Sequence, residues 1–186
     1  MMTTHGSQLT RPVGDGDHAQ GPATAPVTLV EYGDYECPYC GAAYPIVKEV
    51  QRRLGDRLRF VFRNFPITTA HPHAAHAAEA AEAAGAQDRF WEMHDALYEH
   101  QDALGDAQLE EYAAALGLDV ERWVSDMETQ AHLERVRADF MSGVRSGVNG
   151  TPTFFINGRR HDGAHDLEAL IAAIEAATPT TAPQRA

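Results

Sequence analysis

The chain has 186 residues, of which 44% are apolar, and its formal net charge is −12 at pH 7. This length and apolar content suffice for a sizeable core, so we expect one domain or one domain with an insertion. The acidic excess argues against nucleic acid and anionic membrane surfaces as partners, because both carry negative charge. The sequence also lacks the run of about 18 apolar residues that a membrane helix requires.

The N-terminal part of the chain, residues 1–16, is rich in Gly, Thr and other polar residues and is predicted to be a flexible tail. It lacks the apolar stretch of a secretory signal, so we expect a cytoplasmic protein. An upstream leader outside this sequence would overturn that expectation. The region from Asp17 to Pro26 is expected to be a loop with at most a short edge strand.

A strand and a helix are predicted next. The β-rich apolar run Val27–Tyr32 is interrupted only by Glu31. Helical periodicity then begins at Pro38 and continues to Leu54. Proline fits the first helical position, because its missing N–H would have no partner there. The short segment between these elements is therefore a strand-to-helix turn.

The only two cysteines, Cys37 and Cys40, stand at this turn with Pro38 and Tyr39 between them. The free N–H groups and the dipole at a helix N-terminus favour negative charge. Such positions lower the pKa of a cysteine from about 8.5 to roughly 3.5–7.5. We therefore predict an acidic, exposed thiolate at Cys37 that attacks disulfides, and a resolving thiol at Cys40. The intervening dipeptide is expected to tune the acidity of the first thiol.

Two other uses of the cysteines stay open. A structural disulfide is disfavoured, because a ring this short stabilises a fold little and cytoplasmic thiols are mostly kept reduced. A zinc site would need further ligands, and His161 and His165 have a suitable spacing between them. Their large separation from Cys40 in the chain argues against a compact zinc motif, so no metal is expected.

The second predicted strand covers residues 58–65, and its position after a strand and a helix predicts parallel pairing in a right-handed βαβ unit. Between residues 67 and 146 the pattern is helical without a repeat, which predicts a compact helical insertion. His71, His73 and His76 begin this insertion and are expected to be polar groups near a helix start. The sequence does not place any of them beside the cysteines.

After the insertion the pattern returns to strand at Thr153–Ile156. The dipeptide Asn157–Gly158 then predicts a hairpin to an antiparallel strand at Arg159–His161. A final helix is expected from Asp166 to Ala177, followed by a second flexible tail at residues 179–186. The resulting order is strand–helix–strand, helices, strand–strand–helix, which describes an α/β sheet interrupted once.

This order, with Cys-Pro-Tyr-Cys at a helix start and Thr151–Pro152 before the hairpin, resembles the thioredoxin fold. The helical insertion makes the chain similar to the DsbA-like branch of the thiol:disulfide oxidoreductases. The resemblance implies two thioredoxin-fold halves, residues 17–66 and 147–178, on either side of the insertion 67–146. It implies an enzyme that exchanges disulfides with protein substrates through its cysteine pair, without a metal or an organic cofactor.

The resemblance also assigns further residues to the site. Pro152 matches a proline that relatives hold in the cis form beside the disulfide, which leaves the Thr151 backbone free to bind an extended substrate segment. Glu31 matches a buried acid beneath the second cysteine, whose raised pKa would let it accept the Cys40 proton. A solvated glutamate at a strand edge is the alternative. Arg63, on the second strand, is a candidate counter-ion for this acid.

Two other functions stay open. The Pro38–Tyr39 dipeptide is also typical of glutaredoxins, so a glutathione-dependent reductase of mixed disulfides, with glutathione as co-substrate, is one alternative. The other is a non-catalytic binding module that uses the surface around Pro152 and the helical insertion. For the favoured oxidoreductase, a thiol or disulfide of unidentified nature is expected to recycle the cysteine pair. The direction of electron flow is not readable from the sequence.

Overall fold

A computed structural model of the chain describes residues 8–179. Within this range five strands form one mixed sheet: β1 (His18–Gln20), β2 (Val27–Gly33), β3 (Leu58–Asn64), β4 (Thr153–Ile156) and β5 (Arg159–His161). The helices are α1 (Pro38–Leu54), the 3-10 helix η1 (Gly55–Arg57), α2 (Ala74–Gly85), α3 (Phe90–Glu99), α4 (Asp106–Ala115), α5 (Val120–Glu128), α6 (Leu133–Arg145) and α7 (Leu167–Ala177). None of these helices combines the length and the apolar character needed to span a membrane.

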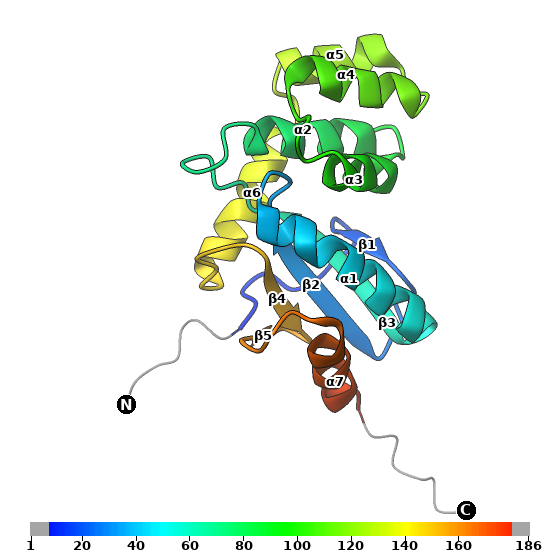
Figure 1. Cartoon of the computed structure of the whole chain (residues 1–186), viewed down its shortest axis with the longest axis vertical. Coiled ribbons are helices and arrows are strands. Elements are labelled where there is room, and N and C mark those ends of the chain that lie inside the picture. The colour runs from blue at the N-terminus through cyan, green and yellow to red at the C-terminus, as the bar shows by residue number, and fades with distance from the viewer. Residues whose placement is uncertain (1–7, 180–186) are drawn as a thin grey trace, which may run out of the picture.

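The strands lie in the order β1-β3-β2-β4-β5 (Figure 1). β2 and β3 are parallel and joined by α1, as the predicted βαβ unit requires. β1 is a short antiparallel edge strand on β3, and β4 runs antiparallel to β2. Asn157 and Gly158 both have positive φ, which the tight turn between β4 and β5 needs. The β-α-β … β-β-α order of a thioredoxin fold is confirmed.

Each face of the sheet is buried, because neighbouring residues of a strand point to opposite sides. Leu29, Phe60 and Phe154 share one core with side chains of α1 and α7. Val30 and Phe155 belong to a second core, against which Phe140 of α6 packs. A strand buried on both faces reads as a nearly continuous apolar run, which explains the Val27–Tyr32 pattern.

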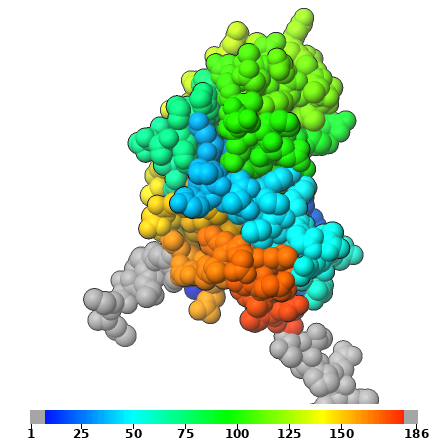
Figure 2. Space-filling model, viewed as in Figure 1, coloured from blue at the N-terminus to red at the C-terminus, as the bar shows by residue number. Residues whose placement is uncertain are grey.

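The insertion between β3 and β4 consists of α2 to α6, as predicted. In Figure 1, α2 and α3 lie next to the start of α1, with α4 and α5 further out. Figure 2 shows the green helices standing above the cyan α1 and the red α7. Alanines of α2 are buried among these helices, including Ala77, Ala80 and Ala84, so their small side chains allow close packing.

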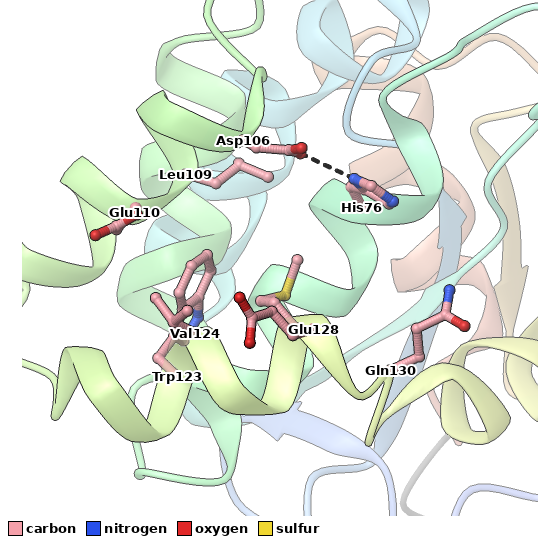
Figure 3. Close-up of a pocket in the computed structure, with 9 residues that line it drawn as sticks. His76, Asp106, Leu109, Glu110, Trp123, Val124, Glu128 and Gln130 are labelled. Atoms are coloured by element: carbon pink, nitrogen blue, oxygen red, sulfur yellow. Dashed lines mark hydrogen bonds and ion pairs between the residues drawn. The ribbon is translucent and has the colours of Figure 1, made fainter.

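The insertion contains a hollow of about 430 Å³ between α2, α4 and α5 (Figure 3). Its lining includes the apolar side chains of Leu109, Trp123, Val124 and Met127 and the carboxylates of Asp106, Glu110 and Glu128. The indole N–H of Trp123 donates to the Ala80 carbonyl at 3.2 Å, which fixes the ring between α5 and α2. Neither cysteine lines this hollow.

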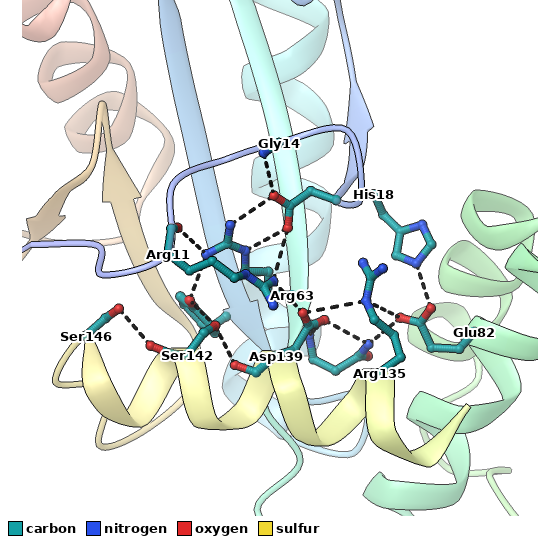
Figure 4. Close-up of polar contacts among 12 residues, drawn as sticks. Arg11, Gly14, His18, Arg63, Glu82, Arg135, Asp139, Ser142 and Ser146 are labelled. Atoms are coloured by element: carbon teal, nitrogen blue, oxygen red, sulfur yellow. Dashed lines mark hydrogen bonds and ion pairs between the residues drawn. The ribbon is translucent and has the colours of Figure 1, made fainter. Parts of the chain in front are cut away.

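The N-terminal segment differs from the predicted tail from residue 8 onward. The Leu9 N–H donates to the Gly158 carbonyl at 2.8 Å, so the chain pairs loosely with the β4–β5 turn. Arg11 then forms ion pairs with Asp17 at 3.2 Å and with Asp139 of α6 at 2.6 Å (Figure 4). Gly158 and Asp139 are far away in the sequence from residues 9–11, and local composition carries no sign of these contacts. The expectations for residues 1–7 and 180–186 lie outside the described residues.

Candidate active site

The two cysteines lie where the chain leaves β2 and enters α1. Cys37 is the residue before the helix and has extended backbone angles, φ −71° and ψ 121°, and Pro38 is the first helical residue. In Figure 2 this blue segment lies between the teal and green parts of the insertion. Tyr39 is 75% exposed, whereas Cys37 is only 3% exposed and Cys40 is fully buried. The prediction of an exposed thiol is wrong, because surrounding loops cover Cys37.

The electrostatics of the two thiols differ sharply. The pKa of Cys37 is lowered to about 5, chiefly by a hydrogen bond with Cys40. Burial opposes this lowering, whereas Thr151 and the N–H groups of Cys40 and Tyr39 add to it. Burial raises the pKa of Cys40, and its hydrogen bond to Cys37 and the charge of Glu31 raise it further. Both cysteines are free. At neutral pH the site therefore holds a thiolate at Cys37 and a thiol at Cys40.

We expect the alkylation rate of Cys37 by iodoacetamide in the reduced protein to follow one ionisation with a midpoint near pH 5. Replacing Cys40 by alanine removes the main hydrogen-bond donor and raises this midpoint, whereas Cys40→Ser keeps a donor and raises it less. Equal midpoints in the two variants would contradict the role of that hydrogen bond.

The same pKa sets a pH dependence of stability. The folded value of about 5 lies below the value of about 8.5 for an unfolded cysteine. The Cys37 thiolate therefore stabilises the reduced fold fully above about pH 8.5. This contribution decreases as the pH falls and is lost as the pH passes through the folded pKa.

The segment before β4 brings Thr151 and Pro152 to the cysteines. The Thr151–Pro152 peptide bond is cis, as the resemblance implies. The Thr151 carbonyl oxygen lies 3.4 Å from the Cys37 sulfur. Pairing of β4 with β2 explains this approach, since Thr153 lies opposite Tyr32 near the end of β2 that leads to the cysteines. Residues from both halves of the sheet thus meet at one sulfur.

Glu31 is a buried acid and not a solvated residue at a strand edge. It is 2% exposed on β2, opposite Phe62 of β3 and Phe154 of β4. Burial raises the pKa of Glu31 to about 8, and the negative charge of Cys37 adds to the rise. This carboxyl also contributes to the raised pKa of Cys40, so it is electrostatically coupled to both thiols.

The suggested counter-ion of Glu31 is wrong. Arg63 lies opposite Tyr32 in the β2–β3 register and donates to the Tyr32 hydroxyl at 3.0 Å. Because side chains alternate along a strand, this places the guanidinium on the face of the sheet away from Glu31. Its ion-pair partner is Asp17, at 2.8 Å.

Asp34 is a site residue that the sequence interpretation missed. Its buried carboxylate accepts hydrogen bonds from the backbone N–H groups of Glu36 at 2.9 Å and Ile67 at 2.8 Å, and lies 2.7 Å from His71 Nδ1. Partial burial disfavours protonated His71, but Asp34 outweighs it and raises the pKa, with a further contribution from Cys37. His71 therefore supports the site, whereas His76 pairs with Asp106 on the insertion, as expected of a polar helix-start residue.

Gln101 was also missed. It lies in the loop between α3 and α4, and its side-chain amide donates to the carbonyls of Tyr35 at 2.8 Å and Cys37 at 2.9 Å. A lone glutamine in a polar loop gives no sequence signal for such a contact, because its partners are far away in the chain.

A zinc site has no set of ligands in the part of the chain that the structure describes. No three His, Cys, Asp or Glu side chains among residues 8–179 are grouped so that they could hold a metal ion. The rings of His161 and His165 are 6.0 Å apart, and His161 Nε2 lies 3.0 Å from the Ala164 carbonyl oxygen.

The chain matches a family model, curated proteins and solved structures. The family model described as Thioredoxin matches residues 14–176. A protein of Salinispora arenicola (strain CNS-205) named Na(+)/H(+) antiporter NhaA 1 is 50% identical over 163 residues, which are 88% of this chain and 25% of that protein. The chain thus spans about a quarter of the length of the curated relatives it matches.

Two solved structures are similar over most of their length. Oxidised BdbD from Bacillus subtilis has a TM-score of 0.81 and 25% identity, with 93% of this chain and 98% of that chain covered. A thioredoxin-like oxidoreductase from Silicibacter pomeroyi DSS-3 has a TM-score of 0.78 and 28% identity, with coverage of 88% and 93%. Both alignments span the sheet together with the helical insertion.

Proposed function

Because the chain belongs to the thioredoxin family, as a DsbA-like member, we propose that it is a thiol-disulfide oxidoreductase that acts on protein substrates through Cys37 and Cys40. One observation carries this proposal. Cys37, whose pKa is lowered, stands at a helix start, and Cys40, whose pKa is raised, is fully buried in the first turn of that helix. This is the asymmetry that a nucleophile and a resolving thiol need.

Reduction of a substrate proceeds in two exchanges. The Cys37 thiolate attacks one sulfur of the substrate disulfide, forms a mixed disulfide, and displaces the other substrate sulfur as a thiolate that takes a proton from water. Cys40 then loses its proton and attacks the Cys37 sulfur, which releases the second substrate thiolate. The substrate gains two electrons, and the enzyme is left with a Cys37–Cys40 disulfide. The reverse sequence oxidises a substrate dithiol.

The intervening dipeptide and Thr151 would assist these steps. The N–H of Tyr39 contributes to the acidity of Cys37, which supports tuning by the Pro38–Tyr39 dipeptide. The Thr151 backbone, beside the reactive sulfur, is suited to pair with an extended substrate segment.

Glu31 would accept the proton of Cys40 in the second exchange. Its pKa is raised partly by the charge on Cys37, and a mixed disulfide removes that charge. A larger fraction of Glu31 is then ionised at the moment when Cys40 must lose its proton.

Glu31→Gln is expected to slow the decay of the mixed disulfide at pH 7 by about tenfold or more, because a positioned base contributes at least this much to proton transfer. The decay is measured in single turnover with a fluorescent peptide disulfide. Glu79→Gln is the matched control, since Glu79 is also buried with a raised pKa but lies on α2. Equal decay rates in the two variants would remove Glu31 from the mechanism.

A second candidate is glutathione-dependent reduction of mixed disulfides. The Pro-Tyr dipeptide of glutaredoxins supports it, and Tyr39 is 75% exposed at the redox turn, where it could contact a small thiol. No metal or organic cofactor is needed for either function. The recycling partner of the cysteine pair has no assignment.

Two assays test the function. We expect catalytic amounts of the purified protein to accelerate the reduction of insulin disulfides by dithiothreitol, and Cys37→Ser/Cys40→Ser not to do so. A glutathione mixed disulfide, with glutathione and glutathione reductase, tests the second candidate. Turnover only in the glutathione assay would replace the first function by the second, and inactivity in both would end both proposals.

The direction of electron flow depends on the compartment. The cytoplasmic location stays a prediction, and a reducing glutathione pool there would favour reduction of substrates. The reduction potential of the cysteine pair, measured in a glutathione buffer, gives the direction in any known compartment.

A further inference from the structure

We propose that Gln101 is a positioning residue that holds the backbone of the redox turn, residues 34–37, in place beside the Cys37 sulfur. Its importance for catalysis rests on the proposed function, but its effect on the thiol does not. One side-chain nitrogen of Gln101 donates to the carbonyls of Tyr35 and Cys37, at 2.8 and 2.9 Å. A single amide thus joins two backbone positions, two residues apart, on the side of the turn that faces the insertion.

The acidity of Cys37 depends on this backbone. The N–H groups of Tyr39 and Cys40 lower the pKa of the Cys37 thiol by hydrogen bonding to its sulfur. They reach the sulfur only if Cys37 keeps the extended angles that place it just outside the helix. The Cys37 carbonyl already accepts the N–H of Gly41 at 3.0 Å, and Gln101 supplies a second donor to it.

Asp34 and Gln101 hold the turn from its two ends. Asp34 accepts the N–H of Glu36 on its side chain and the N–H of Cys37 on its carbonyl. Gln101 holds the carbonyls that follow. The amide hydrogens also offset part of the negative potential that these two carbonyls would exert on a nearby thiolate. Loss of Gln101 should therefore raise the pKa of Cys37.

Gly41 provides the space for this amide. A Cβ at Gly41 would overlap Gln101 Oε1 and lie 2.6 Å from Gln101 Cδ, so the glutamine packs directly on the first turn of α1. Glycine inside a helix is normally less favourable than alanine. The close approach of Gln101 gives a physical reason for the exception. The absence of a side chain at Gly41 is therefore what allows Gln101 to reach the redox turn.

The first test removes the donor. Gln101→Ala is expected to raise the pKa of Cys37 from about 5 by roughly 0.5 or more. A change of this size corresponds to losing much of the free energy of one hydrogen bond that favours the thiolate over the thiol. Gln101→Glu, which places an acceptor against two carbonyl oxygens, should raise it further. The pKa is read from the pH dependence of Cys37 alkylation in the reduced protein. No substrate is involved, so this result is independent of whether the proposed function is correct.

The second test moves the amide without removing it. Gly41→Ala should also raise the Cys37 pKa. The double variant Gly41→Ala/Gln101→Ala should have the same Cys37 pKa as Gln101→Ala alone, because the added methyl group then meets no amide. Gln108→Ala is the control: Gln108 Oε1 also lies close to a glycine, 2.7 Å from a Cβ at Gly105, but at the start of α4. The Cys37 pKa of the Gln108→Ala variant should equal that of the wild-type protein.

Circular dichroism identifies which of the variants Gln101→Ala, Gln101→Glu and Gly41→Ala are folded. The Cys37 pKa of any one folded variant is enough to test the proposal. An unchanged Cys37 pKa in folded Gln101→Ala, Gln101→Glu or Gly41→Ala would overturn the proposal. A variant with lower stability but the same Cys37 pKa as the wild-type protein would likewise show that Gln101 only supports the fold.

Discussion

Cys37→Ser is expected to reduce thiol–disulfide exchange to the rate of a control without protein. The thiolate is the attacking species, and at neutral pH the Cys37 pKa of about 5 keeps this sulfur almost fully ionised. A serine hydroxyl in its place stays protonated and is a far weaker nucleophile. Cys40 cannot replace it, because burial raises its pKa and it is fully buried.

Cys40→Ser is the matched variant for this experiment. It keeps the attacking sulfur but removes the resolving one, so the mixed disulfide forms and then persists. Insulin reduction measures turnover in both variants, and non-reducing gels with mass spectrometry measure the trapped substrate. Full turnover by Cys37→Ser, or trapping by Cys37→Ser instead of Cys40→Ser, would contradict the assigned order of attack.

Arg63→Met is expected to lower the free energy of unfolding by about 3–5 kcal/mol, the usual cost of removing one partner of a buried ion pair. Arg63 is 0% exposed, and its guanidinium binds both oxygens of Asp17, the Tyr32 hydroxyl and the carbonyls of Arg11 and Pro12. Methionine fills similar volume without these donors. Asp17 then remains buried without its main partner. Burial raises the pKa of Asp17, and the Arg63 hydrogen bond is the largest of the contributions that together lower it.

Urea denaturation of the reduced protein measures this change. Arg52→Ala is the control, because Arg52 pairs with Glu49 on the exposed side of α1 and should change stability little. Arg63→Met/Asp17→Leu should be less destabilised than Arg63→Met alone, because no buried carboxylate is then left without its main partner. A loss for Arg63→Met no greater than for Arg52→Ala would contradict the structural role of this network.

The elements that the sequence predicts well are those whose signals are local. The helix bounds Pro38–Leu54 and the strand Thr153–Ile156 are predicted as observed, because periodicity, proline and an Asn-Gly turn lie within a few residues of each boundary. The burial of Glu31 is implied by the family resemblance, because the strand pattern alone leaves a solvated residue at a strand edge as an alternative. The wrong counter-ion, Arg63, shows the limit of this reasoning, since the face on which a residue lies depends on the register between two strands.

The contacts that the sequence does not reveal are those between distant polar residues. Asp34, Gln101 and the segment from residue 8 to residue 16 have no periodic or motif signal, because one or two hydrogen bonds across the fold leave no pattern in composition. The covered position of Cys37 was missed for the same reason. A CxxC motif describes the chemistry of the sulfur but not the loops that close over it.

The redox turn is held by three stretches that are far apart in the chain, at Ile67–His71, Gln101 and Thr151. A chain emerging from the ribosome has made Cys37 long before Thr151 exists. Until this last stretch has folded against the turn, Cys37 lacks the contribution that Thr151 makes to its low pKa. The full acidity of this thiol therefore requires both halves of the sheet to be in place.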